Sequence, residues 1–173
     1  MGVQTTPGDG SALWIELPQV EGPLARHERT PEPAAMAAAD SHQQRTVLYI
    51  EDNLSNLKLV QVILQRRPEV KLLSAMQGDT GLQMAREHVP ALILLDLHLP
   101  DMTGHDVLLR LRAEPATRQT PVIVLSADAT PGQIARLLSA GAHGYLTKPL
   151  DVKKFLDIID QTMQKLDSRQ GGR

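Results

Sequence analysis

After Arg45 the sequence alternates short apolar runs with longer stretches of helical period, and this alternation constrains the fold more than any other feature. The continuous apolar runs are typical of strands that are buried on both faces of a parallel sheet. The predicted strands are 47–50, 70–75, 91–95, 121–125 and 142–146. The predicted helices are 54–66, 80–88, 104–113, 131–140 and 152–166. Strands that alternate with helices in this way predict an α/β fold built from βα units.

The ends of the later helices are marked by residues that favour helix boundaries. Thr130 is a candidate N-cap followed by Pro131 at the first helical position, and Gly141 is a candidate C-terminal stop. The apolar residues of the last helix fall on one stripe: Val152, Phe155, Ile159, Met163 and Leu166. Successive βα units join by right-handed crossovers into an open, doubly wound sheet, whose ligands bind beyond the carboxyl ends of the strands.

Composition changes along the chain predict four segments. Residues 19–44 are rich in proline and alanine, which is typical of a flexible linker. The α/β pattern occupies residues 45–167, a length suited to one compact domain. Residues 1–18 form a separate short segment before the linker, and residues 168–173 are expected to be a frayed tail.

Charged and polar side chains follow the predicted strands at their carboxyl ends. Glu51 and Asp52 follow the first strand, Asp96 the third and Ser126 the fourth, and Lys148 lies just beyond the fifth. These groups should converge on one crevice. Two carboxylates about 4 Å apart repel by on the order of 4 kcal/mol at an effective dielectric constant near 20, so a hard divalent cation is expected there. Mg²⁺ is the best candidate.

The expected site suits phosphoryl chemistry. Mg²⁺ keeps several waters and bridges readily to phosphate oxygens. Asp96 ends the central apolar strand and is the expected nucleophile, while Glu51 and Asp52 form the metal-holding pair and Lys148 supplies a fixed cation. Taken singly, each residue has an ordinary structural explanation, such as an acidic pair favouring the dipole of the following helix. Their convergence at several strand ends favours the phosphate site.

Four stretches of this sequence resemble the motifs of bacterial response-regulator receiver domains. They are VLYIED at 47–52, LILLDLHLPDMTG at 92–104, VIVLSA at 122–127 and YLTKP at 145–149. The resemblance implies a flavodoxin-like sheet with strand order 2-1-3-4-5 and phosphotransfer to Asp96 from a histidine kinase or a histidine phosphotransfer protein. It also implies a Mg²⁺ site formed by Glu51, Asp52, Asp96 and the backbone carbonyl of His98.

The same resemblance implies how the domain would signal. Ser126 would move to hydrogen-bond the phosphoryl group, Tyr145 would turn inward in concert, and the Lys148–Pro149 bond would be cis. The readout surface, which is also a candidate homodimer surface, would be formed by 131–140, 142–146 and 152–166. His98 and Asp128 lie two residues beyond Asp96 and Ser126, at positions that influence the lifetime of the phosphoryl group in this family.

The N-terminal segment carries a second resemblance. Residues 2–18, GVQTTPGDGSALWIELP, are similar to the last hairpin of a histidine-kinase ATPase domain. The kinase catalytic elements are absent from this sequence, which therefore resembles the C-terminal part of a hybrid histidine kinase. An isolated hairpin is marginal in water, so Trp14 is expected to be either exposed or packed against the receiver.

Two other function classes stay open beside a non-enzymatic receiver. A Mg²⁺-dependent phosphatase could use Asp96 as its nucleophile, but such enzymes carry a second aspartate where this sequence has His98. A receiver that is never phosphorylated could serve as a docking scaffold. The net charge of −2 with scattered basic residues argues against nucleic acid and anionic membranes as partners. The absence of cysteines and of a signal sequence predicts a cytoplasmic protein.

Overall fold

The computed structural model describes residues 2–6, 10–14, 44–127 and 130–170, which fall in two compact units, Met1–Ala39 and Asp40–Arg173. In the first unit, β1 (Gly2–Thr6) pairs with β2 (Gly10–Trp14) as an antiparallel hairpin. Almost all of the predicted linker lies outside the described residues, and so does the environment of the Trp14 side chain. None of the helices among the described residues is long and apolar enough to span a bilayer.

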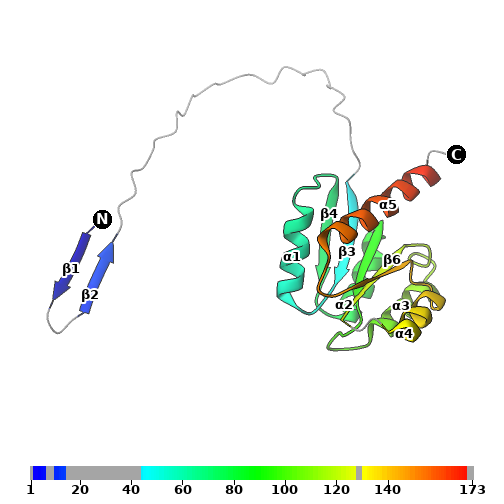
Figure 1. The fold of residues 1–173 in the computed structure, drawn as a ribbon, viewed down its shortest axis with the longest axis horizontal. Helices are drawn as coiled ribbons and strands as arrows, with labels where there is room; N and C mark the ends of the chain where they lie inside the picture. Colours follow the sequence, from blue (N-terminus) through cyan, green and yellow to red (C-terminus); the bar gives the residue numbers. More distant parts are fainter. Residues whose placement is uncertain (1, 7–9, 15–43, 128–129, 171–173) are drawn as a thin grey trace, which may run out of the picture. The chain divides into compact units, whose positions relative to one another are not determined.

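The second unit contains one parallel sheet (Figure 1). Its strands are β3 (Arg45–Ile50), β4 (Val70–Ala75), β5 (Leu92–Asp96), β6 (Val122–Ser126) and β7 (Gly144–Thr147). Their order in the sheet is β4-β3-β5-β6-β7, which is 2-1-3-4-5 when the strands of this sheet are numbered along the chain. The predicted flavodoxin-like α/β fold is therefore confirmed.

Helices cover both faces of this sheet and enclose two hydrophobic cores. The helices are α1 (Leu54–Leu64), α2 (Gly78–His88), α3 (Gly104–Ala113), α4 (Pro131–Ser139) and α5 (Val152–Gln170). Buried residues of α2, α3 and α4 belong to one core, and buried residues of α1 and α5 belong to the other. Figure 1 shows α1 and α5 together on the same side of the sheet.

The central strands supply alternate residues to the two cores. In β3, Leu48 and Ile50 pack in the core on the α2–α3–α4 side, whereas Val47 and Tyr49 pack in the core on the α1–α5 side. Successive side chains of a strand point to opposite faces, so a strand covered on both sides must be apolar at every position. All five residues of β5 are buried: four belong to the continuous apolar run, and the fifth is Asp96 at the carboxyl end.

Several helix ends differ from those expected from the sequence. The α2 helix begins at Gly78, two residues before the predicted Thr80, because Asp101 from a distant loop accepts hydrogen bonds from the N–H groups of Gly78 and Asp79 at 2.8 and 2.9 Å. The α5 helix continues to Gln170 rather than ending at the predicted Leu166. The α1 helix ends at Leu64, two residues before the predicted end.

The predicted start of α4 agrees with the structure, and the helix ends at Ser139, one residue before the predicted end. Thr130 occupies the N-cap position with Pro131 as the first helical residue. Gly141 follows the helix with φ of +99°, a backbone conformation that glycine adopts without steric cost. A side chain at this position would also crowd Arg112, because an added Cβ would lie 2.9 Å from its Nε atom.

Candidate functional site

The carboxyl ends of β3, β5, β6 and β7 bring the predicted site residues to one edge of the sheet. Glu51 follows β3 directly, while Asp96 and Ser126 are the last residues of β5 and β6. Strand register pairs Ile50 with Leu95, Asp96 with Leu125, and Ser126 with Thr147, so neighbouring strands end almost level. Lys148 follows β7 and reaches the same edge.

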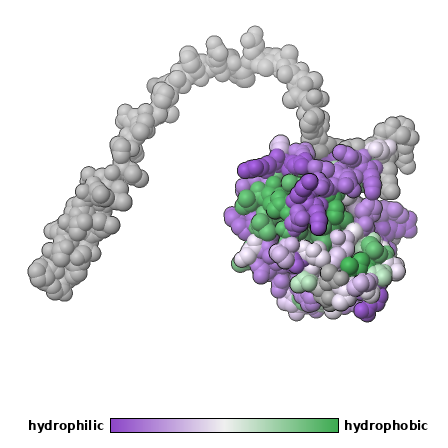
Figure 2. Space-filling view, viewed as in Figure 1, coloured by the Kyte–Doolittle hydropathy of each residue, from purple (hydrophilic) through white to green (hydrophobic). Residues whose placement is uncertain are grey.

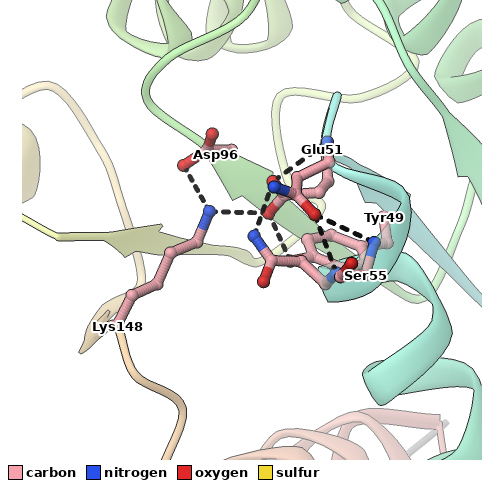
Figure 3. A network of polar contacts seen from close by, with 7 residues as sticks. Tyr49, Glu51, Ser55, Asp96 and Lys148 are labelled. Carbon is pink, nitrogen blue, oxygen red and sulfur yellow. Dashed lines mark hydrogen bonds and ion pairs between the residues drawn. The ribbon is translucent and has the colours of Figure 1, made fainter.

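Three carboxylates and one ammonium group meet there. Carboxylate oxygens of Glu51, Asp52 and Asp96 all lie within 4.8 Å of one another. The Lys148 ammonium lies 2.6 Å from Glu51 Oε2 and 2.9 Å from Asp96 Oδ1 (Figure 3). Glu51 and Asp96 are 1% and 4% exposed, whereas Asp52 is exposed. One cation against three carboxylates leaves excess negative charge on oxygen ligands, and this donor set fits Mg²⁺.

Glu51 is held by more groups than the sequence predicted. Besides Lys148, it accepts a 2.6 Å hydrogen bond from the Tyr49 hydroxyl and a 2.9 Å hydrogen bond from the Asn56 amide. The backbone N–H of Asn53 adds a longer bond at 3.3 Å. Tyr49 precedes Glu51 by two positions, so their side chains lie on the same side of the chain. That spacing is the only sequence signal of this contact.

Electrostatics differ between the two buried carboxylates. Burial would raise the pKa of Glu51, but hydrogen bonds from Lys148, Tyr49 and Asn56 outweigh it and lower that pKa. Burial and the nearby Glu51 charge instead raise the pKa of Asp96, in spite of the opposing bond from Lys148. Burial and the bond to Glu51 raise the pKa of Tyr49, so its hydroxyl stays protonated and donates. Of the two buried carboxyl groups, Asp96 is therefore the one whose ionised form is disfavoured.

Lys148 itself is stabilised as a cation. Burial alone would lower its pKa, but its hydrogen bonds to Glu51 and Asp96 outweigh that effect and raise it. The ammonium group is therefore charged at neutral pH and stays between the two carboxylates. The Lys148–Pro149 bond is cis, as the resemblance implied.

Neither residue of the acidic pair is the N-cap of the first helix, whose dipole offered a simple structural explanation for Glu51 and Asp52. The N-cap of α1 is Asn53, whose side-chain oxygen accepts hydrogen bonds from the N–H groups of Ser55 and Asn56. Glu51 precedes this cap, and its carboxylate accepts hydrogen bonds from the Asn53 N–H, the Asn56 amide and Lys148. The helix start is thus satisfied by a neutral residue, and the acidic pair is left for the pocket.

The remaining predicted residues are placed as follows. Ser126 is fully buried at the end of β6, and Tyr145 is half-buried against the core on the α2–α3–α4 side. His98 is exposed in the loop after β5, where its backbone bridges to Thr103. Asp128 lies outside the described residues. The switching and dephosphorylation roles of these residues remain predictions.

Comparisons with known proteins agree on one family. Residues 47–160 match the model of the response regulator receiver domain. The polar-differentiation response regulator DivK of Brucella ovis is 33% identical over 115 residues, which cover 66% of this chain and 93% of DivK.

Solved structures point the same way. The receiver domain of the sensor histidine kinase PA1611 from Pseudomonas aeruginosa PAO1, which has a magnesium ion in its active-site cleft, is 27% identical with a TM-score of 0.63. The match covers 69% of this chain and 98% of that one. The chemotaxis protein CheY4 of Vibrio cholerae, at 24% identity and a TM-score of 0.64 over 69% of this chain and 98% of its own, supports the fold alone. The chain therefore belongs to the response-regulator receiver family and contains a phosphoacceptor domain of two-component signalling, not a catalytic enzyme, with an acidic pocket suited to Mg²⁺.

Proposed function

We propose that Asp96 is the phosphoacceptor and that its donor is a phosphohistidine on a histidine kinase or a histidine phosphotransfer protein. The observation that carries this proposal is the contact of the buried Asp96 carboxylate with Lys148 beside two further carboxylates. An Asp96 carboxylate oxygen forms a bond to phosphorus while the phosphorus–nitrogen bond of the donor breaks. The electron pair of that bond returns to the imidazole nitrogen, and the product is an acyl phosphate on Asp96.

Glu51, Asp52, Asp96 and the backbone carbonyl of His98 form the proposed Mg²⁺ site. When bound, the cation supplies positive charge that stabilises the phosphoryl oxygens during transfer. Lys148 supplies a second positive charge, and its hydrogen bonds to the two buried carboxylates keep its ammonium group oriented.

Signalling follows from the residues next to this pocket. Ser126 hydrogen-bonds the new phosphoryl group, and Tyr145, on the neighbouring strand β7, turns inward as Ser126 moves. The readout surface is the face formed by α4, β7 and α5, through which the domain also forms a homodimer when phosphorylated. A hydrogen bond to a charged group contributes about 1.5 to 3 kcal/mol, which is enough to shift a two-state equilibrium at least tenfold.

The lifetime of the phosphoryl group is set by His98 and Asp128. Each follows a site residue by two positions, and His98 is exposed at the edge of the pocket. Changing His98 to Ala or Asp128 to Ala should alter the dephosphorylation rate measured by loss of the acyl phosphate. Unchanged lifetimes in both variants would remove these two residues from the proposal.

The kinase partner approaches along α1. This helix begins two residues after Asp52, and it exposes the apolar side chains of Leu54, Leu59 and Val62, with Leu54 at 68% exposure. Figure 2 shows an apolar area on the face of the domain that carries α1 and α5 in this view. Apolar residues beside a charged pocket suit the docking of an amphipathic partner helix, which would bring its histidine close to Asp96.

The N-terminal segment supports an origin at the C-terminal end of a hybrid histidine kinase. Within this segment β1 pairs with β2 in antiparallel fashion, as the last two strands of an ATPase domain would. A cytoplasmic location is part of this proposal, because the sequence lacks cysteines and the expected donors are kinase domains.

One experiment tests the phosphoacceptor. The chain is incubated with Mg²⁺ and a small acyl-phosphate donor, and intact mass and hydroxylamine sensitivity are recorded for the wild type, Asp96→Asn and Asp157→Asn. Asp157 is an exposed aspartate on α5 and serves as the matched control. A stoichiometric, hydroxylamine-sensitive adduct in the wild type and Asp157→Asn but not in Asp96→Asn supports the proposal. No adduct in any of the three would favour the docking scaffold.

A further inference from the structure

The Glu51 carboxylate has a complete set of hydrogen-bond donors supplied by the protein itself. Its Oε2 atom accepts from the Tyr49 hydroxyl and from Lys148 at 2.6 Å each, and its Oε1 atom accepts from the Asn56 amide at 2.9 Å and the Asn53 N–H at 3.3 Å. An ionised carboxylate offers about four lone-pair sites. Glu51 must therefore give up one of these bonds before it can bind a cation directly.

The donors that hold Glu51 lie on rigid elements. Tyr49 is only 1% exposed, and its ring packs in the core on the α1–α5 side from the central strand β3. Asn56 lies in the first turn of α1, which Asn53 caps. Figure 3 shows Tyr49 and Lys148 reaching toward Glu51 from different parts of the chain. The carboxylate is thus fixed in orientation before any cation arrives.

Cations differ in what they require from such a carboxylate. Ca²⁺ takes six to eight oxygen ligands and commonly binds carboxylates in bidentate fashion, whereas Mg²⁺ is smaller, requires octahedral geometry and keeps several waters. A site in which Asp52 and Asp96 are available but Glu51 is held back has few protein ligands for Ca²⁺. The same site suffices for a cation that retains water.

We propose that Tyr49 is a positioning residue that sets the cation selectivity of the site. Its hydroxyl, together with the Asn56 amide, holds Glu51 away from direct coordination and thereby favours Mg²⁺ over Ca²⁺. This inference rests on the proposed Mg²⁺ site and refines the part of Glu51 in it: the carboxylate faces the water shell of Mg²⁺ and does not bind the cation directly. Removal of the hydroxyl frees one lone pair of Glu51 Oε2, and the carboxylate can then join the ligands of the larger cation.

The test measures binding of Mg²⁺ and Ca²⁺ to the full chain by isothermal titration calorimetry, without a phosphoryl donor. Tyr49→Phe keeps the buried ring and removes only the hydroxyl. We expect the ratio of the Ca²⁺ to the Mg²⁺ dissociation constant to fall about tenfold, the effect of about 1.4 kcal/mol. Asn56→Ala should lower the ratio in the same direction, because it frees a lone pair of Oε1, and it provides a second test if Tyr49→Phe does not fold.

Two controls separate positioning from a general effect on the fold. Thr117, between α3 and β6, has another buried hydroxyl, which donates a 2.9 Å hydrogen bond to the backbone carbonyl of Leu111. Thr117→Val removes this hydroxyl and should leave the ratio unchanged. In a Glu51→Gln background, Tyr49→Phe should add no further change in the ratio, because Tyr49 acts through the Glu51 carboxylate.

The outcomes distinguish this inference from the proposed function. Wild-type protein that binds neither cation would overturn both. Wild-type protein that binds Mg²⁺, with folded Tyr49→Phe and Asn56→Ala variants that keep the wild-type ratio, would overturn only the role of Tyr49. An equal change in Thr117→Val would also overturn it, since the effect would then be one of stability.

Discussion

A basic side chain lies at each end of the sheet, and the two side chains have different hydrogen-bond partners. At the carboxyl ends, Lys148 contacts the buried carboxylates of Glu51 and Asp96 in the acidic site. At the amino ends, Arg112 contacts neutral backbone carbonyls, which we call the Arg112 network: its guanidinium donates to Thr120 at 2.9 Å and to Gly141 at 2.8 and 3.0 Å. Weaker bonds at 3.5 and 3.3 Å reach the carbonyls of Thr117 and Arg118.

This difference separates groups placed for stability from groups placed for chemistry. The carbonyls of Thr120 and Gly141 lie in the segments before β6 and β7, and the guanidinium donates to both at once. The acidic site instead holds more carboxylates than its one lysine can neutralise. A cation from solution can complete the acidic site, whereas the Arg112 network is complete within the chain.

The largest effect is expected from removing the lysine of the acidic site. In Lys148→Met, two carboxylates stay buried without their counter-charge, so the free energy of unfolding at neutral pH should fall by about 3 kcal/mol in the absence of divalent cations. Saturating Mg²⁺ should restore much of that loss, because it binds the folded state at the same carboxylates. Denaturant unfolding with and without Mg²⁺ measures both changes.

Lys153→Met, at an exposed position of α5, is the matched control and should be close to neutral in both conditions. A Lys148→Met protein as stable as the wild type in the absence of Mg²⁺ would show that the two carboxylates do not depend on this cation. The contrast between the two ends of the sheet would then lose its basis.

A smaller loss, with no response to Mg²⁺, is expected from the Arg112 network. Arg112→Met keeps much of the apolar stem but removes the donors to the carbonyls of Thr120 and Gly141, which should lower the free energy of unfolding by about 2 kcal/mol. The same unfolding experiment provides the measurement. Recovery by Mg²⁺ in this variant would contradict the separation of the two regions, and so would loss of phosphorylation in folded protein.

The sequence was sufficient for the parts of this comparison that depend on local patterns. Apolar runs predict the strands, and parallel strands have their carboxyl ends at the same edge of the sheet. The sequence alone therefore places Glu51, Asp52, Asp96 and Lys148 at that edge. The role of each residue cannot be obtained in this way, because the pattern gives position along a strand and not the direction of each polar atom.

The local sequence pattern does not predict contacts between segments that are far apart in the chain. Asp101, in a loop more than twenty residues away in the sequence, accepts a hydrogen bond at the start of α2. Arg112 donates to the backbone carbonyl of Gly141, which is 29 residues further along the chain. Each such contact depends on the packing of two elements that are separately predictable, but no local signal links them. The sequence places Tyr49 in an apolar run typical of a buried strand, and this pattern does not predict the contact of its hydroxyl with Glu51.

The smallest effect tests whether the acidic site stores charge repulsion in the fold. The pKa of Asp96 is raised by burial and by the Glu51 charge, so the folded protein binds this proton more tightly than the unfolded chain does. Ionised Asp96 therefore destabilises the fold above its raised pKa, and Asp96→Asn should be more stable than the wild type at neutral pH by on the order of 1 kcal/mol without Mg²⁺. As pH falls through the raised pKa, Asp96 of the folded wild type becomes protonated and the difference in stability should shrink. The difference is lost below the pKa of the unfolded chain, near about 3.9.

The unfolding free energies of the two proteins from neutral to acidic pH provide the measurement, and Asp157→Asn is an exposed control whose effect should be near zero throughout. A variant less stable than the wild type at neutral pH would mean that the attraction to Lys148 exceeds the repulsion from Glu51, and the excess negative charge would then carry no cost in the absence of the cation.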